Sequence, residues 1–346
     1  MNGNTSRAYR PTGRSPRDRR REDRLRTGLI AGIILVAMAA VLFLTLIIIE
    51  LAGRPGKDPA DDPGIEQPSG AFDLAEIEVP SKSVHAGDLI LINSTYPYVF
   101  PETSPVVLPV INNRTVHGKS EKGNNIYSYY TQNGEAKCAK LEEKTLTLFQ
   151  RWTDDFYRAT QNSDLFIFDE DGYRTKEDQE KLVQKKPTQY AAAGATEHHT
   201  GKATDLYVYT GKISGNIDDP GFISIFSWIY DNAYKYGFIH RYPAEKESIT
   251  GVAYEPYHFR QVGYAHAFYM YKNGYCLEEY LDLITNGHTA ESPLEFKADD
   301  GNTYMVYYQK ADEGDITKLS VPAQLAYSIS GDNRGGFVIT VTANEE

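Results

Sequence analysis

The sequence contains little cysteine, with only Cys138 and Cys276 among 346 residues. Two cysteines cannot form the disulfide framework that stabilises many small secreted domains. They could pair with each other in an oxidising compartment, or both could be free thiols. Net positive charge is also lacking over most of the chain, whose total formal charge is −11.

The N-terminal segment, by contrast, carries a net positive charge. Residues 1–27 hold nine arginines against three acidic residues, a balance of +6 that leaves −17 for the remaining residues. An acidic balance of this size argues against attraction to nucleic acid or to an anionic lipid surface. We therefore expect no nucleic-acid partner.

A long apolar run follows the basic tail. Residues 29–49 carry no charge, and fourteen of these twenty-one are Leu, Ile, Val or Phe. As a helix this run spans about 31 Å, enough to cross a bilayer core of roughly 30 Å. The basic flank places the N-terminus in the cytoplasm. A cleaved signal peptide is the alternative.

The sequence is predicted to divide into a cytoplasmic tail (1–27), a transmembrane helix (28–50), a flexible linker (51–80), a main domain (81–288, core about 140–265) and a C-terminal β extension (289–346).

The main domain mixes helices and strands without regular alternation, which favours an α+β fold with an antiparallel sheet. Apolar spacing predicts a helix over about 141–161, and Thr175 is a candidate cap for a second helix that ends near residue 186. Strands are expected near residues 89–93, 304–308 and 336–341.

Four residues have the side chains that metal-assisted hydrolysis requires. His198, Asp205 and His258 offer nitrogen and carboxylate donors that suit zinc, and Glu255 is available as a base. The common His-Glu-x-x-His helix is absent. Pro256 disfavours a helical Glu255, so the pair of Glu255 and His258 is expected on a bent strand or turn.

The neighbouring residues carry a family resemblance. Thr196-x-His198-x-x-Gly201-x-Ala203-x-Asp205 is similar to the Ser-x-His-x-x-Gly-x-Ala-x-Asp signature of the VanY-type D-alanyl-D-alanine carboxypeptidases. Residues 255–260 resemble that family's Glu-Pro-Trp-His-x-Arg, and residues 172–175 resemble its Ser-Gly-Tyr-Arg-Ser. Thr196 stands in place of Ser, and Tyr257 in place of Trp.

The resemblance implies a specific fold and site. The fold is the zinc D,D-peptidase fold shared with the Hedgehog signalling domain, with a central antiparallel sheet. His198, Asp205 and His258 would bind Zn²⁺, and Glu255 would be the catalytic base. Arg174 would contact the developing oxyanion or the terminal carboxylate of the substrate, and Gln179 and Thr196 would contact the substrate. The neighbouring His199 is expected to be a spectator.

The function that follows is a membrane-anchored zinc carboxypeptidase of the bacterial cell surface, with its catalytic domain outside the cell. It would remove the terminal D-alanine from peptidoglycan stem peptides that end in D-Ala-D-Ala. Two alternatives remain open at this stage. One is a D,D-dipeptidase or peptidoglycan endopeptidase on the same fold, and the other is a non-catalytic wall-binding or sensor protein.

Overall fold

The structure, a computed structural model, describes residues 73–343 apart from residue 113 and residues 132–137. The expected cytoplasmic tail, the transmembrane helix and most of the linker lie outside these residues. Among the helices of the described part, none combines the length and the apolar character needed to cross a membrane.

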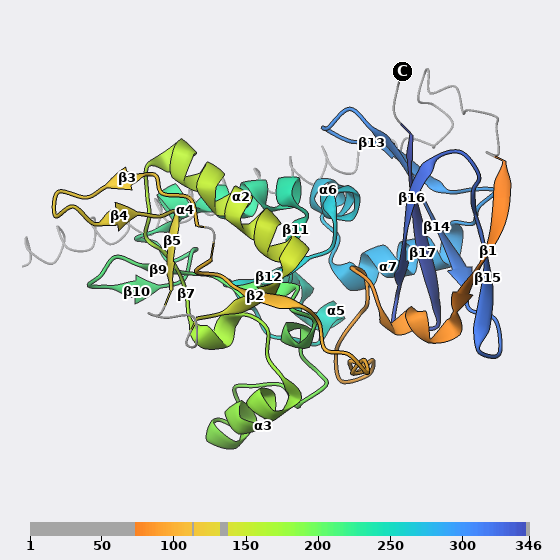
Figure 1. The fold of residues 1–346 in the computed structure, drawn as a ribbon, viewed down its shortest axis with the longest axis horizontal. Coiled ribbons are helices and arrows are strands. Elements are labelled where there is room, and N and C mark those ends of the chain that lie inside the picture. The colour runs from red at the N-terminus through yellow and green to blue at the C-terminus, as the bar shows by residue number, and fades with distance from the viewer. Residues whose placement is uncertain (1–72, 113, 132–137, 344–346) are drawn as a thin grey trace, which may run out of the picture. The chain divides into compact units, whose positions relative to one another are not determined.

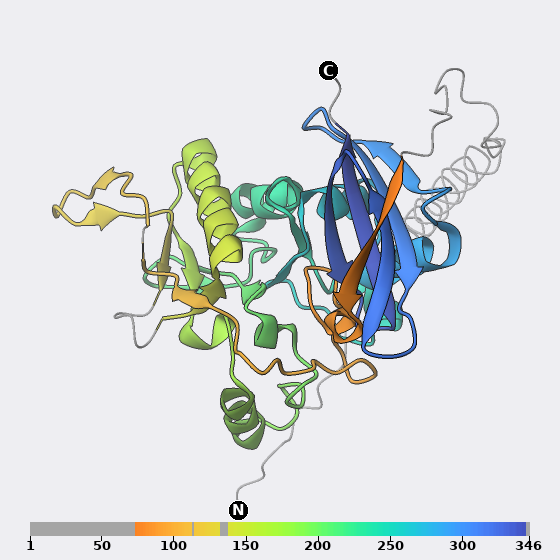
Figure 2. The ribbon, with the colours of Figure 1, turned by 45° about the vertical axis from the view of Figure 1, so that its right-hand side comes forward.

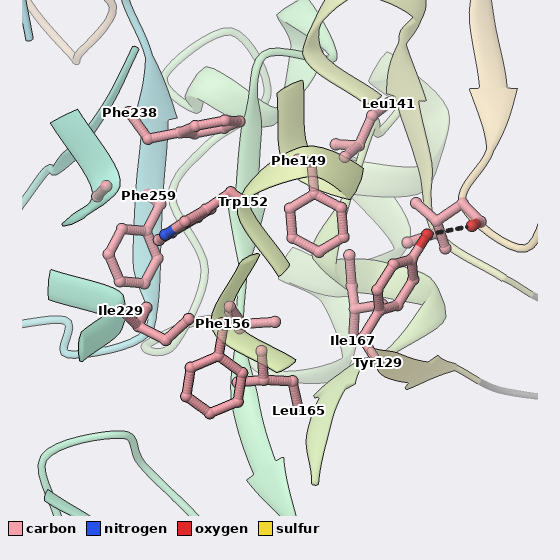
Figure 3. Packing of buried hydrophobic residues seen from close by; sticks show 14 of the residues in the cluster. Tyr129, Leu141, Phe149, Trp152, Phe156, Leu165, Ile167, Ile229, Phe238 and Phe259 are labelled. Atoms are coloured by element: carbon pink, nitrogen blue, oxygen red, sulfur yellow. Dashed lines mark hydrogen bonds between the residues drawn. The ribbon is translucent and has the colours of Figure 1, made fainter. Parts of the chain in front are cut away.

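The long helix α2 (Glu143–Thr160) organises the first hydrophobic core, and its position confirms the helix predicted over 141–161. The Glu142 side chain accepts a hydrogen bond from the Thr145 backbone N–H at 2.9 Å and so caps the first turn. At the other end Gln161 adopts a left-handed conformation with φ of 55°, which terminates the helix. Between these ends, Phe149, Trp152 and Phe156 turn one fully buried face toward the strands (Figure 3).

Two main sheets lie in this region. One has the order β10–β9–β7–β5, and the other has the order β11–β12–β8. Their strands are β5 (Tyr129–Thr131), β7 (Leu165–Ile167), β8 (Ala203–Asp205), β9 (Tyr207–Tyr209), β10 (Ser214–Gly215), β11 (Phe238–His240) and β12 (His258–Gln261). The expected antiparallel sheet is present as β11–β12–β8, whereas in the other sheet β5 pairs with β7 in parallel. The connection between these two strands runs through α2, and a helical crossover of this kind is what lets neighbouring strands run parallel.

Smaller elements complete the region. Thr175 caps α3 (Lys176–Lys185), as predicted, by accepting a hydrogen bond from the Asp178 backbone N–H at 3.1 Å. Two short antiparallel pairs join β2 (Val107–Pro109) to β6 (Lys140–Glu142) and β3 (Gly118–Lys119) to β4 (Asn125–Ile126). The other helices are η1 (Ser81–His85), η3 (Asp169–Asp171), η4 (Glu197–Thr200), α4 (Ile223–Asn232), η5 (Ala233–Tyr236), η6 (Ala244–Lys246), α5 (Glu247–Thr250), α6 (Tyr264–Asn273) and α7 (Leu277–Gly287).

The C-terminal residues form a separate four-stranded sheet, with the order β13–β14–β17–β16 (Figure 1). Its strands are β13 (Leu294–Lys297), β14 (Thr303–Lys310), β16 (Ala326–Gly331) and β17 (Gly336–Ala343). The strands expected near 304–308 and 336–341 are therefore confirmed as β14 and β17. Helix α7 packs on β14, and both contribute to one hydrophobic cluster with α6.

Two expectations near the start of the described region are wrong. Residues 74–80 were expected in the linker but form β1 (Leu74–Pro80), which pairs with β15 (Ile316–Pro322) as Figure 2 shows. Alternate residues of this strand point to the same side, and Ile77 and Val79 thereby pack against a hydrophobic cluster that includes Leu319, Val321 and Ile339. Residues 89–92 are buried but form no strand, and Leu91 instead donates its backbone N–H to the Asp332 carbonyl at 3.1 Å.

The two cysteines do not pair. Within the described residues no disulfide joins Cys138 to Cys276, and both thiols are buried. The first belongs to the core around α2, whereas the second lies at the start of α7. Covalent cross-linking therefore contributes nothing to the described fold.

Candidate active site

Strand pairing brings two of the predicted metal ligands together. Asp205 ends β8 and His258 begins β12, and the antiparallel register of these strands places the two residues directly opposite each other. His198 lies on η4, and Gly201, with φ of 71°, allows the chain to turn back from η4 into β8. One nitrogen or oxygen atom from each of the three residues lies within 4.8 Å of the others.

The two imidazole rings are oriented by hydrogen bonds. His198 Nδ1 lies 2.8 Å from the Gly172 carbonyl oxygen and must donate to it, so the lone pair is on Nε2. That nitrogen lies 3.4 Å from an Asp205 carboxylate oxygen. Burial, reinforced by the charge of Arg174, lowers the pKa of His198 to about 4, so its ring is neutral and able to act as a ligand.

His258 faces carboxylates on both sides. Its Nδ1 lies 2.7 Å from Asp205 Oδ1, and its Nε2 lies 3.4 Å from Glu197 Oε2. Burial opposes protonation, but the two carboxylates outweigh it and raise the pKa of His258 to about 10. Burial likewise opposes the charged form of Asp205, yet the two histidines hold its pKa below its usual value.

Glu255 stands beside this cluster on the loop before β12. Its backbone N–H donates to the Tyr242 carbonyl at 3.1 Å, which fixes the loop. The carboxylate lies 3.8 Å from His258 Nδ1, and its side chain is 29% exposed, so solvent can reach it. Burial is the main cause of a raised pKa for Glu255. A carboxylate with a raised pKa is suited to exchange protons with water.

Arg174 also contacts the cluster, and it lies in the segment between η3 and α3. One guanidinium nitrogen lies 3.4 Å from Asp205 Oδ2, and another lies 3.3 Å from Gln179 Oε1. The Gln179 amide nitrogen donates to the Ala191 carbonyl at 2.7 Å. The oxygen of this amide thus binds Arg174, and its nitrogen binds the loop before η4.

All seven residues singled out from the sequence line one cavity of about 130 Å³. They are Arg174, Gln179, Thr196, His198, Asp205, Glu255 and His258. The Thr196 hydroxyl accepts a hydrogen bond from the His198 backbone N–H at 3.4 Å, so this residue also shapes the ligand turn. A larger cavity of about 420 Å³ lies beside β11 and α6, but it contains none of these seven residues.

The sequence interpretation missed two neighbours. His199, expected to be a spectator, uses both ring nitrogens: Nδ1 donates to the Arg174 carbonyl at 2.8 Å, and Nε2 accepts from the Gly194 N–H at 3.0 Å. It therefore ties the Arg174 segment to the loop before η4. Glu197, the variable position inside the signature, is fully buried against two arginines. Only its place between the signature residues Thr196 and His198 could have drawn attention to it.

The donor set fits a zinc ion. Two histidines and one carboxylate are the ligand types of a catalytic zinc site, and the nearby carboxylate of Glu255 remains outside the trio. The described fold and this site together define a metallopeptidase of the α+β class.

Comparison with known proteins identifies the family. Residues 140–264 match the family model described as VanY, D-alanyl-D-alanine carboxypeptidase. A D-alanyl-D-alanine carboxypeptidase of Enterococcus faecium is 30% identical over 280 residues, covering 80% of this chain and 82% of that protein. A second, from Enterococcus faecalis, is 33% identical over 149 residues, covering 38% of this chain and 53% of that protein.

Among solved structures, the vancomycin-resistance D,D-dipeptidase VanXYg, in complex with a D-Ala-D-Ala phosphinate analogue, resembles this chain with a TM-score of 0.62. The two are 25% identical, and the match covers 78% of this chain and 100% of that one. The chain belongs to the VanY-type D-alanyl-D-alanine carboxypeptidase family and is an enzyme of the metallopeptidase class. The predicted α+β D,D-peptidase fold is confirmed for the described residues.

Proposed function

We propose that this enzyme removes the terminal D-alanine from peptidoglycan stem peptides ending in D-Ala-D-Ala. The observation that carries the proposal is the convergence of His198, Asp205 and His258 beside a partly exposed Glu255 in one cavity. The name of the Enterococcus faecium relative, which matches most of both chains, supports the same substrate.

Zinc would be held by His198 Nε2, an Asp205 oxygen and His258 Nδ1. When bound, it lowers the pKa of water and polarises the scissile carbonyl. The chain's own groups perform the proton transfers and the charge stabilisation. Glu255 takes a proton from the attacking water and passes it to the leaving amine nitrogen of D-alanine.

Arg174 supplies positive charge on the other side of the cavity. Its guanidinium is buried, with 7% of the side chain exposed, so its charge acts in a region of low dielectric. There it can stabilise the oxyanion that develops on the substrate, or it can bind the terminal carboxylate. Gln179 and Thr196 would contribute to the substrate pocket mainly by positioning Arg174 and His198.

The test uses the full chain with one equivalent of Zn²⁺ and a pentapeptide that ends in D-Ala-D-Ala. Release of free D-alanine is the expected result. Glu255→Ala should retain the metal and lose roughly 10²–10⁴-fold in turnover, the usual contribution of a positioned acid–base group. His258→Ala should lose both metal and activity. Full turnover by Glu255→Ala would refute the assigned base.

A D,D-dipeptidase is the second candidate. The overall likeness to VanXYg and a 35% identity over 127 residues to a bifunctional D-Ala-D-Ala dipeptidase and carboxypeptidase of Enterococcus gallinarum favour it. The free dipeptide D-Ala-D-Ala distinguishes the two activities. A carboxypeptidase that requires the preceding stem residues should leave the dipeptide intact, whereas a dipeptidase should cleave it.

We also propose that residues 28–50 anchor the enzyme in the bacterial cell membrane, with the N-terminus in the cytoplasm. The apolar run and the arginine-rich flank support this topology. Protease added outside intact cells should release a fragment that begins in residues 51–72. Mature protein that always begins near residue 53 would show a cleaved signal peptide instead.

A further inference from the structure

Four charged side chains lie buried together behind the metal-ligand cluster. Glu197, Arg241 and Arg260 have fully buried side chains, and the Glu278 side chain is 11% exposed. None of them lies among the residues to which the proposed chemistry assigns a role. Burial of isolated charges costs several kcal/mol per ion, so such a group persists only where its members neutralise one another.

Glu197 is the centre of this buried charge group. Its Oε1 lies 2.9 Å from Arg241 Nε and 3.2 Å from Arg260 Nη1. Both contacts are ion pairs between one carboxylate oxygen and a buried guanidinium, and together they fix the orientation of the Glu197 side chain. The second oxygen, Oε2, is turned toward His258 Nε2 at 3.4 Å.

Arg241 links this carboxylate to a distant part of the chain. Its Nη1 and Nη2 donate to the two oxygens of Glu278 at 2.8 and 2.7 Å, a two-pronged pairing that fixes the plane of the guanidinium. Glu278 lies in the first turn of α7, the helix that packs on β14. It also lies beyond residues 140–264, which match the family model.

The consequence for His258 follows from its two ring nitrogens. A neutral imidazole has one donor and one acceptor nitrogen, and the partner of one nitrogen decides which role the other takes. A carboxylate at Nε2 retains the proton there. Nδ1, which lies 2.7 Å from Asp205 Oδ1, would then be the nitrogen that gives up its proton and offers its lone pair to a bound metal.

We propose that Glu197 is a positioning residue for the metal site, which holds His258 with Nδ1 toward the metal, and that Glu278 anchors it through Arg241. The C-terminal part of the chain thereby contributes to the geometry of the site. This inference rests on the proposed function, because it requires that the His198, Asp205 and His258 trio binds a metal.

The sharpest variant is Glu197→Asp. It retains the negative charge between the two arginines but withdraws the carboxylate from His258 by about 1.5 Å, one carbon–carbon bond. Zn²⁺ affinity, measured by competition with a chromophoric chelator, should fall by about 10–100-fold, as is typical for the loss of a hydrogen-bonding partner behind a metal ligand. The visible absorption of the Co²⁺-loaded protein should also change, because it reports ligand geometry independently of activity.

Glu278→Gln tests the anchor while leaving Glu197 in place. Zn²⁺ affinity should fall about tenfold, the lower end of the same range, because the effect passes through Arg241. Asp282→Asn is the matched control. Asp282 lies on the same helix and forms an ion pair with Arg334 at 2.7 Å, but its side chain is 59% exposed. This control should retain wild-type affinity and spectrum.

The outcomes separate this inference from the proposed function. Wild-type protein that binds no Zn²⁺ refutes both the metal site and the inference. Wild-type protein that binds Zn²⁺, with a folded Glu197→Asp that has the same affinity and the same Co²⁺ spectrum, refutes the positioning role alone. If Glu197→Asp does not fold, Glu278→Gln decides: a loss of affinity no larger than that of Asp282→Asn overturns the proposal.

Discussion

Asp88 should make a pH-dependent contribution to the stability of the fold. Its carboxylate lies 2.7 Å from Lys202 Nζ and 2.9 Å from Lys144 Nζ. Lys202 belongs to the turn between His198 and Asp205, and Lys144 belongs to the first turn of α2. The pair of contacts therefore ties the segment before residues 89–92 both to the core helix and to the metal-ligand turn.

The magnitude follows from the shift in pKa. Burial opposes the charged form of Asp88, but the two lysines outweigh it and lower its pKa from 3.8 to about 2. A pKa lowered from 3.8 to about 2 corresponds to about 2.5 kcal/mol of stability, since each pH unit is equivalent to about 1.36 kcal/mol. Because the folded-state pKa is depressed, this stability is fully present well above pH 3.8 and is lost as the pH falls through about 2. Linkage leaves about half of it at pH 3.

The assay is urea unfolding of Asp88→Asn and wild type, both metal-free. The variant should be less stable by about 2.5 kcal/mol at pH 7, and the difference should shrink to about half of that at pH 3. Glu76→Gln is the control, because its partner Lys318 lies at 2.7 Å but the pair is 60% and 56% exposed. An exposed pair should contribute only about 0–1 kcal/mol. A pH-independent difference between Asp88→Asn and wild type would refute the electrostatic explanation.

Three further variants test the packing around the site. Gly172→Ala should lower metal content, measured by elemental analysis, because a Cβ there would lie 2.4 Å from the Lys140 carbonyl oxygen and displace the carbonyl that orients a metal ligand. His199→Leu should lose about 2 kcal/mol of stability from two hydrogen bonds, and kcat/KM should fall further because the backbone of Arg174 is released. Trp152→Ala should destabilise the fold by about 3–5 kcal/mol in urea without weakening metal affinity of the folded protein, because its side chain lies in the core and outside the cavity.

Local patterns in the sequence predicted the elements whose causes are local. Helix α2 follows from apolar residues that recur at helical spacing, and α3 follows from the hydroxyl of Thr175 at its first turn. The strands β14 and β17 are rich in aromatic and β-branched residues. Each of these signals lies within about ten residues, so no knowledge of the tertiary fold is needed to read it.

Elements with distant causes were not predicted. Residues 74–80 form a strand because they pair with β15, more than 230 residues further along the chain. Residues 89–92 have the composition of a strand, but the carbonyl of Asp332 and the side chain of Ser330 accept the N–H groups of Leu91 and Leu89. The structure of both segments thus depends on contacts with residues 316–332, which no local pattern describes.

In the candidate site, too, some features could be predicted from the sequence and others depend on distant segments. Asp205 and His258 could be expected near each other from a motif, and the β8–β12 register explains why that motif brings them together. The orientation of the rings could not be predicted, because it depends on partners from other segments. The Gly172 carbonyl directs His198, and the carboxylate of Glu197 faces His258.

A metal site requires both that its ligands lie close together and that their rings are correctly oriented. Strand register brings ligands to within a few ångströms, but a catalytic constellation has to be held to about 0.5 Å by hydrogen bonds from surrounding residues. In this chain the pairing that brings two ligands together involves only β8 and β12. Glu278, which supports the site through Arg241, instead lies on α7, and that helix packs on β14 of the C-terminal sheet. The motifs contain the ligands and also Glu197 and Gly172, which contact them. Glu278, which pairs with Arg241 behind Glu197, lies outside these motifs, so the support of the site extends beyond the residues that a motif records.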